Sequence, residues 1–465
     1  MRIAIYFFIS AFILMCTTRG LAQQAANEGG GTLPVTVNDA AHPCITPGQY
    51  AYLQQRINDN IARLHLDKRG YRTTASTTFA WPLMPATGLN DCSYYYIGNY
   101  VDEDVTTGIK DYNCGSVTYD GHRGTDICSA PYPFLKMDNN LLNVVAAAPG
   151  TIIEKSDGYF DKNCAMSSDT ANYIIIQHAD GSVALYWHMK KYSLTTKIVG
   201  QTVVTGEFLG VVGSSGSSTA PHLHFEVWKT TASADLNDPW TGTCNLLNPA
   251  TWWIAQKPYT EPAVIKAQVN SIPVVLPGCD TTETPNEDTC FAPGASAKFY
   301  IFLRNETTGL VVHERIVNPD GSTFSNWVHN STTNYLASYW FFTRTLPAIA
   351  GTYMYETVYN SDTCRYPFIV NCAALQTPSS LHSPEWSVYP NPATGQLHIS
   401  ATDCGNGAKV LLRNAIGQLI LSDEIAPGSG QVAKTYALDG IPAGIYFITF
   451  ESANMTETRK VIVTD

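Results

Sequence analysis

The chain has 465 residues, and at about 150 residues per domain this length predicts roughly three domains. Hydrophobic residues make up 45% of it and charged residues only 14%, a composition typical of folded, strand-rich proteins and not of disordered ones. The net charge of −11 argues against nucleic acid as a partner, because no basic surplus exists to neutralise phosphates.

The N-terminus has the pattern of a secretory signal. A basic residue is followed by an apolar run, Ile3 to Met15, and by a Gly-Leu-Ala sequence at 20–22. This arrangement predicts cleavage after about residue 22, and the apolar run is too short for a comfortable membrane span. A methionine is a poor residue before a lipidated cysteine, which disfavours an anchor at Cys16. We expect residues 1–22 to be removed and the mature chain to be exported without a transmembrane anchor.

Residues 23–78 form an N-terminal segment with one expected helix. The stretch TPGQYAYLQQRINDNIARLHL at 46–66 has helical spacing, with Thr46 as a candidate N-cap and Pro47 in the first turn. The apolar side chains that share one face are Tyr50, Leu53, Ile57, Ile61 and Leu64. Residues 23–42 are polar and rich in glycine, so no regular element is expected there.

From Phe79 to Trp228 the sequence changes to short strands and turns. The β-rich runs are separated by Asp-Gly, Pro-Gly and Gly-Ser pairs, which favour turns. The run HADGSVALYWHM predicts a hairpin that turns at Asp180-Gly181. We expect one β-rich domain over residues 79–255.

Two further β-rich domains are expected towards the C-terminus. Residues 256–278 contain several prolines and predict a linker. Alternation and turn spacing over 279–374 predict an Ig-like β-sandwich, and a second linker is expected at 375–386. Residues 387–465 end in alternating strands and predict another small β-sandwich. The predicted fold class is therefore mainly β, an antiparallel β-sheet domain followed by two β-sandwich domains.

The middle sandwich is rich in aromatic residues. They are Trp327, Tyr335, Tyr339, Trp340, Phe341 and Phe342. Alternation along the YWFF run predicts that at least half of them are core residues. The remainder are candidates for an exposed sugar-binding surface.

Eleven of the 12 cysteines follow the expected signal, and no two of them form a C-x-x-C pair. In an exported chain this spread favours disulfides over a cysteine zinc site. The local pairs Cys279–Cys290 and Cys364–Cys372 are plausible, although the connectivity cannot be deduced from sequence. The odd number leaves at least one thiol unpaired within the chain.

Four histidines and an aspartate lie in three short segments of the first β-rich domain. The stretch YDGHRGTDIC holds His122 and Asp126, and its glycines let the backbone bring the carboxylate round to the imidazole. His188 follows a predicted strand in YWHMKK. His222 and His224 are two residues apart in the strand APHLHFEV, so their side chains emerge on one face.

These side chains fit a catalytic zinc site. Imidazole nitrogens and carboxylate oxygens bind Zn²⁺ well, and a catalytic zinc ion keeps three protein ligands and one position open to water. His122, Asp126 and His224 supply three ligands. His188 and His222 then remain beside the metal, where they can transfer protons or stabilise an oxyanion. The alternative is that each histidine is an ordinary structural residue.

The motifs GHRGTD, ALYWHM and GSSGSSTAPHLHFEV, in this order, closely resemble those of the lysostaphin/LytM/LasA-type zinc metalloendopeptidases. The resemblance covers about residues 79–232. It implies an antiparallel β-sheet with a groove along it, and hydrolysis of peptide bonds, usually in peptidoglycan. It also implies one zinc ion on the two histidines and the aspartate named above as ligands, with His188 and His222 as the catalytic pair.

Two further expectations follow from this resemblance. Asn172 lies where the family has an asparagine beside the groove, which makes it a candidate substrate contact. The Gly/Ser-rich loop at 213–218 is expected to form a flexible wall of the groove.

The C-terminal segment resembles the sorting domain of type IX secretion substrates. The resemblance is carried by YPNPATGQLHI, LLRNAIGQLI and LDGIPAGIYFITF within residues 387–465. It implies recognition by the type IX machinery, transport through the periplasm and across the outer membrane, and then release or attachment at the cell surface. An ordinary β-sandwich binding module is the alternative.

Together these features predict a secreted or surface-attached zinc metalloendopeptidase that hydrolyses peptide bonds, in peptidoglycan stem peptides or cross-bridges, through zinc-activated water. One alternative is an extracellular protein-degrading metalloprotease, and another is an inactive cell-wall-binding surface protein. Residues 23–78 are a candidate pro-region because they lie between the signal and the catalytic domain, and 43–78 could act as a latency element over the groove.

Overall fold

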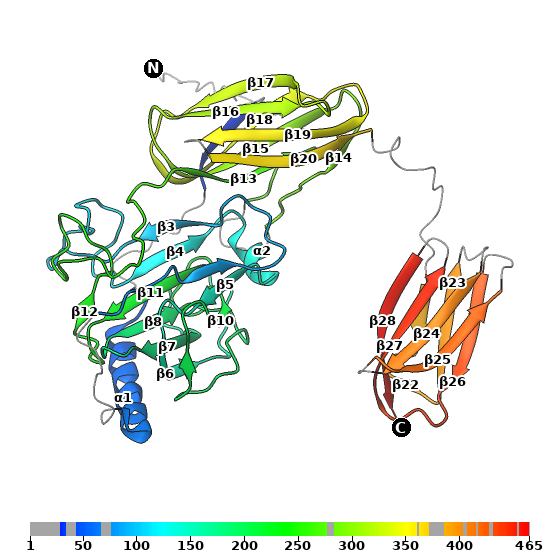
Figure 1. The fold of residues 1–465 in the computed structure, drawn as a ribbon, viewed down its shortest axis with the longest axis horizontal. Coiled ribbons are helices and arrows are strands. Elements are labelled where there is room, and N and C mark those ends of the chain that lie inside the picture. Colours follow the sequence, from blue (N-terminus) through cyan, green and yellow to red (C-terminus); the bar gives the residue numbers. More distant parts are fainter. Residues whose placement is uncertain are drawn as a thin grey trace, which may run out of the picture. The chain divides into compact units, whose positions relative to one another are not determined.

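The computed structural model describes residues 28–33, 43–66, 76–276, 283–359, 362–371, 386–402, 407–414, 417–426, 431–452 and 455–464. They form mainly antiparallel β-sheets, which confirms the predicted fold class (Figure 1). The chain divides into two compact units, Met1–Cys372 and Ala373–Asp465. Neither helix in the described ranges is long and apolar enough to cross a bilayer. The expected signal peptide and nearly all of the second linker lie outside these ranges.

An eight-stranded antiparallel sheet forms the centre of the first unit. In spatial order its strands are β3 (Tyr95–Asn99), β4 (Thr125–Ser129), β11 (His222–Trp228), β8 (Val183–Trp187), β7 (Tyr173–Gln177), β6 (Gly150–Ser156) and β9 (Thr202–Val203), with β12 (Leu236–Asn237) paired to β11. Successive side chains of a strand point to opposite faces, so each strand contributes to two cores. On one face Tyr186 and Phe225 share a core with the three-stranded sheet β10 (Phe208–Val211), β5 (Leu142–Val145) and β2 (Leu83–Pro85).

Helix α1 (Pro47–Leu64) covers the opposite face of the eight-stranded sheet. The predicted cap is present: Thr46 Oγ1 accepts a hydrogen bond from Gln49 N at 3.2 Å, and Gln49 Oε1 accepts one from Thr46 N at 2.7 Å. Leu53 and Ile57 are fully buried in a cluster with sheet residues. The sheet side of this cluster is formed by Ile153, Tyr173, Ile175, Val183, Leu185, Trp187 and Trp228. The expected apolar face of the helix is therefore its packing face.

A β-sandwich completes the first unit. One sheet has the order β1 (Glu28–Thr32), β18 (Tyr335–Thr345), β15 (Ser296–Glu306) and β13 (Ala263–Asn270). The other has the order β14 (Cys290–Phe291), β20 (Asp362–Val370), β19 (Gly351–Tyr359), β16 (Val311–Val317) and β17 (Thr323–Asn330), with β14 parallel to β20. Phe299, Ile301 and Tyr355 lie between the two sheets in their shared core.

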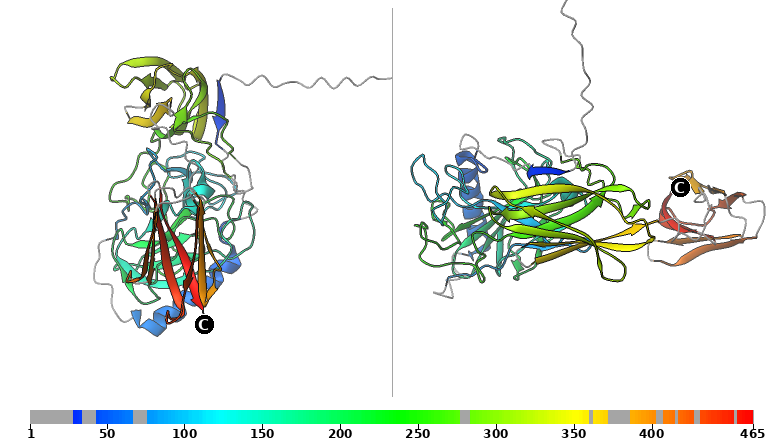
Figure 2. Two further views of the ribbon diagram at one scale, coloured as in Figure 1. Left: turned by 90° about the vertical axis from the view of Figure 1, so that its right-hand side faces the viewer. Right: turned by 90° about the horizontal axis from the view of Figure 1, so that it is seen from above.

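Two strands of this sandwich lie where the sequence suggested none. The stretch 256–278, expected to be a linker, contains β13, because the alternating residues AVIKAQVN between Pro262 and Pro273 pair with β15. The glycine-rich residues 28–32 form β1 against β18 (Figure 2). A Cβ at Gly30 would lie 2.1 Å from the Tyr339 carbonyl oxygen, so this close approach requires glycine.

The aromatic residues of the middle sandwich do not form an exposed platform. Phe342 is buried, and the other five that the sequence singled out are half-buried. Trp327 and Trp340 pack on the core between the sheets, whereas Tyr339 and Phe341 pack in a second cluster. The hypothesis of an exposed sugar-binding surface built from these residues is therefore wrong.

The second cluster joins the sandwich to the eight-stranded sheet. Tyr300 and Phe302 of β15 pack there with Tyr96 and Tyr132, the latter just before the short helix α2 (Pro133–Asp138). Arg304 adds polar contacts, because its guanidinium donates to Ser93 Oγ at 3.0 Å and lies over the ring of Tyr95.

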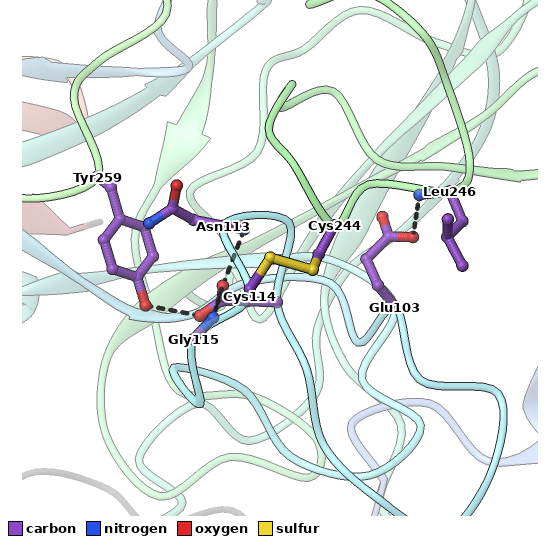
Figure 3. Close-up of a disulfide and its surroundings, with 8 residues drawn as sticks. Glu103, Asn113, Cys114, Gly115, Cys244, Leu246 and Tyr259 are labelled. Carbon is purple, nitrogen blue, oxygen red and sulfur yellow. Dashed lines mark hydrogen bonds between the residues drawn. A yellow bond between two sulfur atoms is a disulfide. The ribbon is translucent and has the colours of Figure 1, made fainter.

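Disulfides fix both parts of the first unit. Cys92, just before β3, is bonded to Cys364 of β20, so the expected local pair Cys364–Cys372 is wrong. Folding places the loop before β3 beside β20, a contact that sequence proximity does not reveal. Cys114 is bonded to Cys244, and Asp111 organises the neighbouring loop by accepting hydrogen bonds from the nitrogens of Asn113 and Gly115 (Figure 3). Cys164 and Cys290 are also disulfide-bonded, while the suggested partner Cys279 lies outside the described residues.

The second unit is a separate small β-sandwich. Its sheets have the orders β21 (Trp386–Tyr389), β23 (Gln396–Thr402), β26 (Gln431–Ala437), and β22 (Ala393–Thr394), β28 (Met455–Thr464), β27 (Gly444–Ser452), β24 (Ala408–Asn414), β25 (Leu419–Ile425). Trp386, Ile448 and Phe450 lie in their common core. This is the sandwich expected from the alternating sequence.

Candidate active site

The three predicted ligands meet at one point on the helix-covered side of the eight-stranded sheet. Asp126 on β4 lies directly opposite His224 on β11 in the strand pairing, and His122 lies in the turn before β4. His122 Nε2 is 3.2 Å from Asp126 Oδ2 and 3.2 Å from His224 Nδ1. His224 Nδ1 is 2.9 Å from Asp126 Oδ1. A Cβ at Gly124 would lie 2.6 Å from His224 Cε1, so the tight approach of this turn depends on glycine.

The outer nitrogens of His122 and His224 have acceptors that fix their tautomers. His122 Nδ1 donates to the Tyr100 carbonyl oxygen at 2.6 Å, and His224 Nε2 donates to Glu226 Oε2 at 3.2 Å. Each ring therefore turns its second nitrogen, His122 Nε2 or His224 Nδ1, towards the shared point, where a metal ion can take the place of a proton. Asn99 holds the carboxylate by donating from Nδ2 to Asp126 Oδ2 at 2.9 Å.

The two remaining histidines lie beside this point. The ring centres of His188 and His222 are 4.5 Å apart. Each Nδ1 donates to a backbone carbonyl, that of Ser215 at 2.6 Å and that of Ala220 at 2.8 Å. Each Nε2 is buried and has no hydrogen-bond partner. His222 Nε2 lies 3.6 Å from Asp126 Oδ1, so this nitrogen faces the shared point.

Charges in the site favour a cation at the shared point. Burial opposes the charged form of His122, but the Asp126 carboxylate outweighs it and raises the pKa of His122 to about 9. Burial also opposes ionisation of Asp126, but the charges of His122 and His222 outweigh it and hold the pKa of this carboxyl well below its usual value. Burial, then the charge of His222, lowers the pKa of His188. An ionised carboxylate thus faces two imidazoles across a short gap.

The donor set fits a zinc ion. With metal–ligand bonds of about 2.0–2.1 Å, the ligand atoms of a tetrahedral zinc site lie about 3.3 Å apart. The three separations of 2.9 to 3.2 Å are close to this value. Two nitrogen lone pairs and a carboxylate this close to one another need a positive charge between them.

Cys44 is a site residue that the sequence analysis did not select. Its Sγ belongs to one group of candidate metal-binding atoms with His122, Asp126 and His224, and to another with His188 and His222; within each group all atoms lie within 4.8 Å of one another. The odd cysteine count signalled an unpaired thiol but could not say which one. Cys44 and Cys128 are the cysteines outside disulfides in the described part of the chain.

Glu226 and Asn99 were also missed. Glu226 follows His224 by two residues on the same strand, so alternation alone places it on the same face and could have identified it. No comparable signal marks Asn99, because its contact with Asp126 joins residues 27 positions apart on two paired strands.

Asn172 supports the backbone beside His188. Its side chain is fully buried and is bonded to backbone groups: Oδ1 accepts from Tyr159 N at 2.8 Å, and Nδ2 donates to the carbonyl oxygens of Tyr159 and Met189, each at 3.0 Å. The expected contact with substrate stays a prediction.

The Gly/Ser-rich loop is more ordered than expected. Ser214, Ser215, Ser217 and Ser218 are buried, and their hydroxyls bond to neighbouring groups. Ser215 Oγ donates to the Met189 carbonyl, while its own carbonyl holds His188. The loop is thus a support for His188 in this structure rather than a flexible wall.

Comparison with known proteins places this site in a family. Residues 121–236 match the model described as "Peptidase family M23", and residues 387–464 match the model described as "Secretion system C-terminal sorting domain". The chain therefore carries an M23 peptidase domain of the lysostaphin/LytM type and a C-terminal sorting domain, which indicates export.

Similar curated proteins include peptidoglycan enzymes. The chain is 29% identical over 105 residues to the peptidoglycan DD-endopeptidase ShyC of Vibrio cholerae, covering 23% of this chain and 19% of that protein. It is 44% identical over 55 residues to the DD-carboxypeptidase/endopeptidase Mpg of Neisseria meningitidis, covering 12% of each. The matched stretches span 12% to 19% of the lengths of the curated relatives.

Two solved structures are also similar. The catalytic domain of lysostaphin from Staphylococcus simulans is 26% identical, with 31% of this chain and 89% of that chain covered and a TM-score of 0.21. A catalytic domain of the prophage-encoded M23 protein EnpA from Enterococcus faecalis is 24% identical, with 33% and 93% covered and a TM-score of 0.19.

Proposed function

We propose that this chain is an exported zinc metalloendopeptidase that hydrolyses peptide bonds in peptidoglycan stem peptides or cross-bridges. In this proposal His122, Asp126 and His224 hold one zinc ion, and His188 and His222 are the catalytic pair. Residues 79–255 form the catalytic domain, and residues 387–465 direct secretion through the type IX machinery to the cell surface or beyond.

The observation that carries the proposal is the convergence of five side chains from three segments. The three ligand side chains approach one another to between 2.9 and 3.2 Å, and the rings of His188 and His222, whose Nε2 atoms lack hydrogen-bond partners, lie beside them. The buried Nε2 of His178 also has no hydrogen-bond partner, so the distinguishing feature of His188 and His222 is that they lie beside the three ligand side chains.

The chemistry divides between the ion and the protein. When bound, the zinc ion supplies a Lewis acid that polarises a carbonyl group and lowers the pKa of water. His188 and His222 each hold a proton on Nδ1 through a backbone carbonyl, which leaves Nε2 to accept a proton or, once protonated, to donate one to the amine that leaves. Asn99 and Glu226 keep the ligands oriented.

Peptidoglycan is favoured as the substrate because one of the similar proteins, ShyC, is named a peptidoglycan DD-endopeptidase, whereas no exposed feature of the described residues singles out a protein substrate. The test is mass analysis of the products that metal-loaded protein releases from defined peptidoglycans, run beside denatured and fibrous proteins. Release of new amino groups from peptidoglycan supports the proposal. Cleavage of the proteins alone would replace it with a protein-degrading enzyme.

Variants separate the roles of the five residues. We expect His122→Ala and His224→Ala to abolish both zinc binding and hydrolysis. His188→Ala and His222→Ala should retain zinc while turnover falls by about 10²–10⁴-fold, the usual contribution of an acid or base group. Zinc content is measured by elemental analysis on each folded variant. Full hydrolysis after complete removal of metal would contradict the proposal.

A further inference from the structure

Cys44 lies at the point where the catalytic metal is expected. Its side chain is almost fully buried, and its Sγ lies within 4.8 Å of ligand atoms of His122, Asp126 and His224. The nearest hydrogen-bond partner is Tyr119, whose hydroxyl is 3.1 Å from Sγ. The thiol also joins a group with His188 and His222, whose Nε2 atoms have no hydrogen-bond partner, and His222 Nε2 is 3.6 Å from Asp126 Oδ1.

The position of Cys44 is fixed by the helix that follows it. Cys44 and Ile45 lie in the same apolar cluster as Leu53 and Ile57 of α1, and Thr46 caps the helix directly after them. This cluster lies on the catalytic face of the eight-stranded sheet. Packing of α1 therefore delivers the thiol to the site, as Figure 1 shows for the helix beside β6, β7 and β8.

Polar contacts fasten the same segment along its length. Tyr50 Oη donates to Glu226 Oε2 at 2.7 Å, and this is the oxygen that also accepts from His224. Gln54 Nε2 donates to the Thr231 carbonyl at 2.9 Å. Asn60 donates to Glu154 near the other end of α1. The contact from Tyr50 reaches a residue that orients His224, and the other two contacts fasten α1 to groups outside the site.

The segment closes the site to substrates. The five site residues are at most 3% exposed in this structure, whereas a peptide bond must reach the metal and both catalytic histidines for hydrolysis. Apolar side chains of residues 43–66 fill the face of the sheet on which an extended peptide would lie.

We infer that Cys44 is the fourth ligand of the metal, and that residues 43–66 are a latency element that holds the peptidase inactive until they are removed. Thiolate sulfur is among the strongest zinc ligands, and a catalytic zinc with three protein ligands has one position left to fill. The inference rests on the proposed function, because it assigns an occupant to that site's open position.

X-ray absorption at the zinc edge of the full-length chain tests the coordination directly. We expect a sulfur shell at about 2.3 Å in addition to nitrogen and oxygen neighbours. Cys44→Ser should lose the sulfur shell and keep the metal. Cys128→Ser is the matched control, because Cys128 is also buried and outside any disulfide, and its Sγ is 4.0 Å from a backbone oxygen of Asp126. It should retain the sulfur shell.

A second experiment releases residues 43–66 from the folded chain and measures activity. Recognition sites for a specific protease are inserted between Leu33 and Pro43 and between Leu66 and Ser76, and peptidoglycan hydrolysis is measured before and after cutting. We expect activity to rise by more than about tenfold once residues 43–66 dissociate. A synthetic peptide of residues 43–66 should then inhibit the cut enzyme, and the same peptide with Cys44→Ser should do so about a hundredfold more weakly.

The outcomes separate this inference from the proposed function. A zinc-bound chain without a sulfur shell would rule out coordination by Cys44, even if the cut enzyme hydrolyses peptidoglycan. Equal activity before and after verified removal of the segment would rule out latency. A chain that binds no zinc with or without Cys44 would overturn both proposals.

Discussion

Glu226 belongs to the candidate site although it is not one of the proposed metal ligands. This buried carboxylate accepts hydrogen bonds from Tyr50, Trp228 Nε1 at 2.6 Å and Arg123 Nε at 3.1 Å, besides the one from His224. Burial opposes its ionisation, but the hydrogen bond from His224 and the charge of Arg123 outweigh it and lower the pKa of Glu226. The negative charge favours a proton on His224 Nε2 and so leaves Nδ1 free to bind metal.

Removal of this charge should weaken the metal site without emptying it. For Glu226→Gln we expect zinc affinity to fall by about tenfold, at the low end of the effect of changing a partner of a metal-bound histidine. Competition with a chromophoric chelator measures this. Glu154→Gln is the control, because Glu154 is likewise buried and hydrogen-bonded but contacts Asn60 and Arg56 rather than a ligand. Equal affinities in both variants would contradict a role for Glu226.

Sequence reasoning at this scale succeeded where spacing determines position. Alternation on one strand placed His222 and His224 together, and the glycines around His122 allowed the turn that brings in Asp126. Cys44 could not be located in the same way, because its contact with His224 joins positions far apart in the chain. The bonds of the Asn172 amide to the backbone could not be predicted either, because a position in a family says where a residue lies but not which groups its amide binds.

At the scale of elements, helix α1 is the one whose packing controls the site. The spacing of apolar residues along the sequence predicted both the helix and the face that it buries, and the cap at Thr46 confirms where the helix begins. The spacing could not show which part of the protein the apolar face of the helix covers. The strands β13 and β1 were missed for a related reason. A proline-flanked or glycine-rich stretch becomes a strand only when it can pair with the edge strand of an existing sheet.

A charge in the buried face of α1 should detach the helix. Ile57 is fully buried, and replacing an apolar side chain of this size loses about 1.5–3 kcal/mol of burial before the cost of the carboxylate is added. For Ile57→Asp we expect limited proteolysis to cut within Pro47–Leu64 much faster than in the unaltered chain. Tyr52→Asp is the control, because Tyr52 is on the same helix but is 57% exposed. Similar cleavage in both variants would show that α1 is not held by this face.

At the scale of the whole molecule, the first unit combines the catalytic sheet and the sandwich into one body. The disulfide between Cys92 and Cys364 closes a sequence separation of 272 residues across their boundary, and Arg304 and the Tyr300 cluster reinforce it. The fold class could be predicted from the alternation of apolar and polar residues. The disulfide between Cys92 and Cys364 could not, because it depends on how the two parts of the first unit pack against each other.

Loss of that bond should uncouple the two parts. For Cys92→Ser/Cys364→Ser we expect the free energy of unfolding to fall by about 2–4 kcal/mol and calorimetry to resolve separate transitions for sheet and sandwich. Cys114→Ser/Cys244→Ser is the matched control, since it removes a bond within the catalytic part (Figure 3). A single shared transition in the first variant would indicate that the apolar contacts alone couple the two parts.

Strand β1 limits how residues 43–66 can be released from the site. Because residues 28–32 are hydrogen-bonded to β18, a single cut after Leu66 leaves the inhibitory stretch tethered to the sandwich. A tether of this length keeps its far end near its target at an effective concentration on the order of millimolar, so rebinding outpaces escape. Complete dissociation of residues 43–66 therefore requires a second cleavage upstream of Cys44, or separation of β1 from β18. The time between the two steps delays full activity.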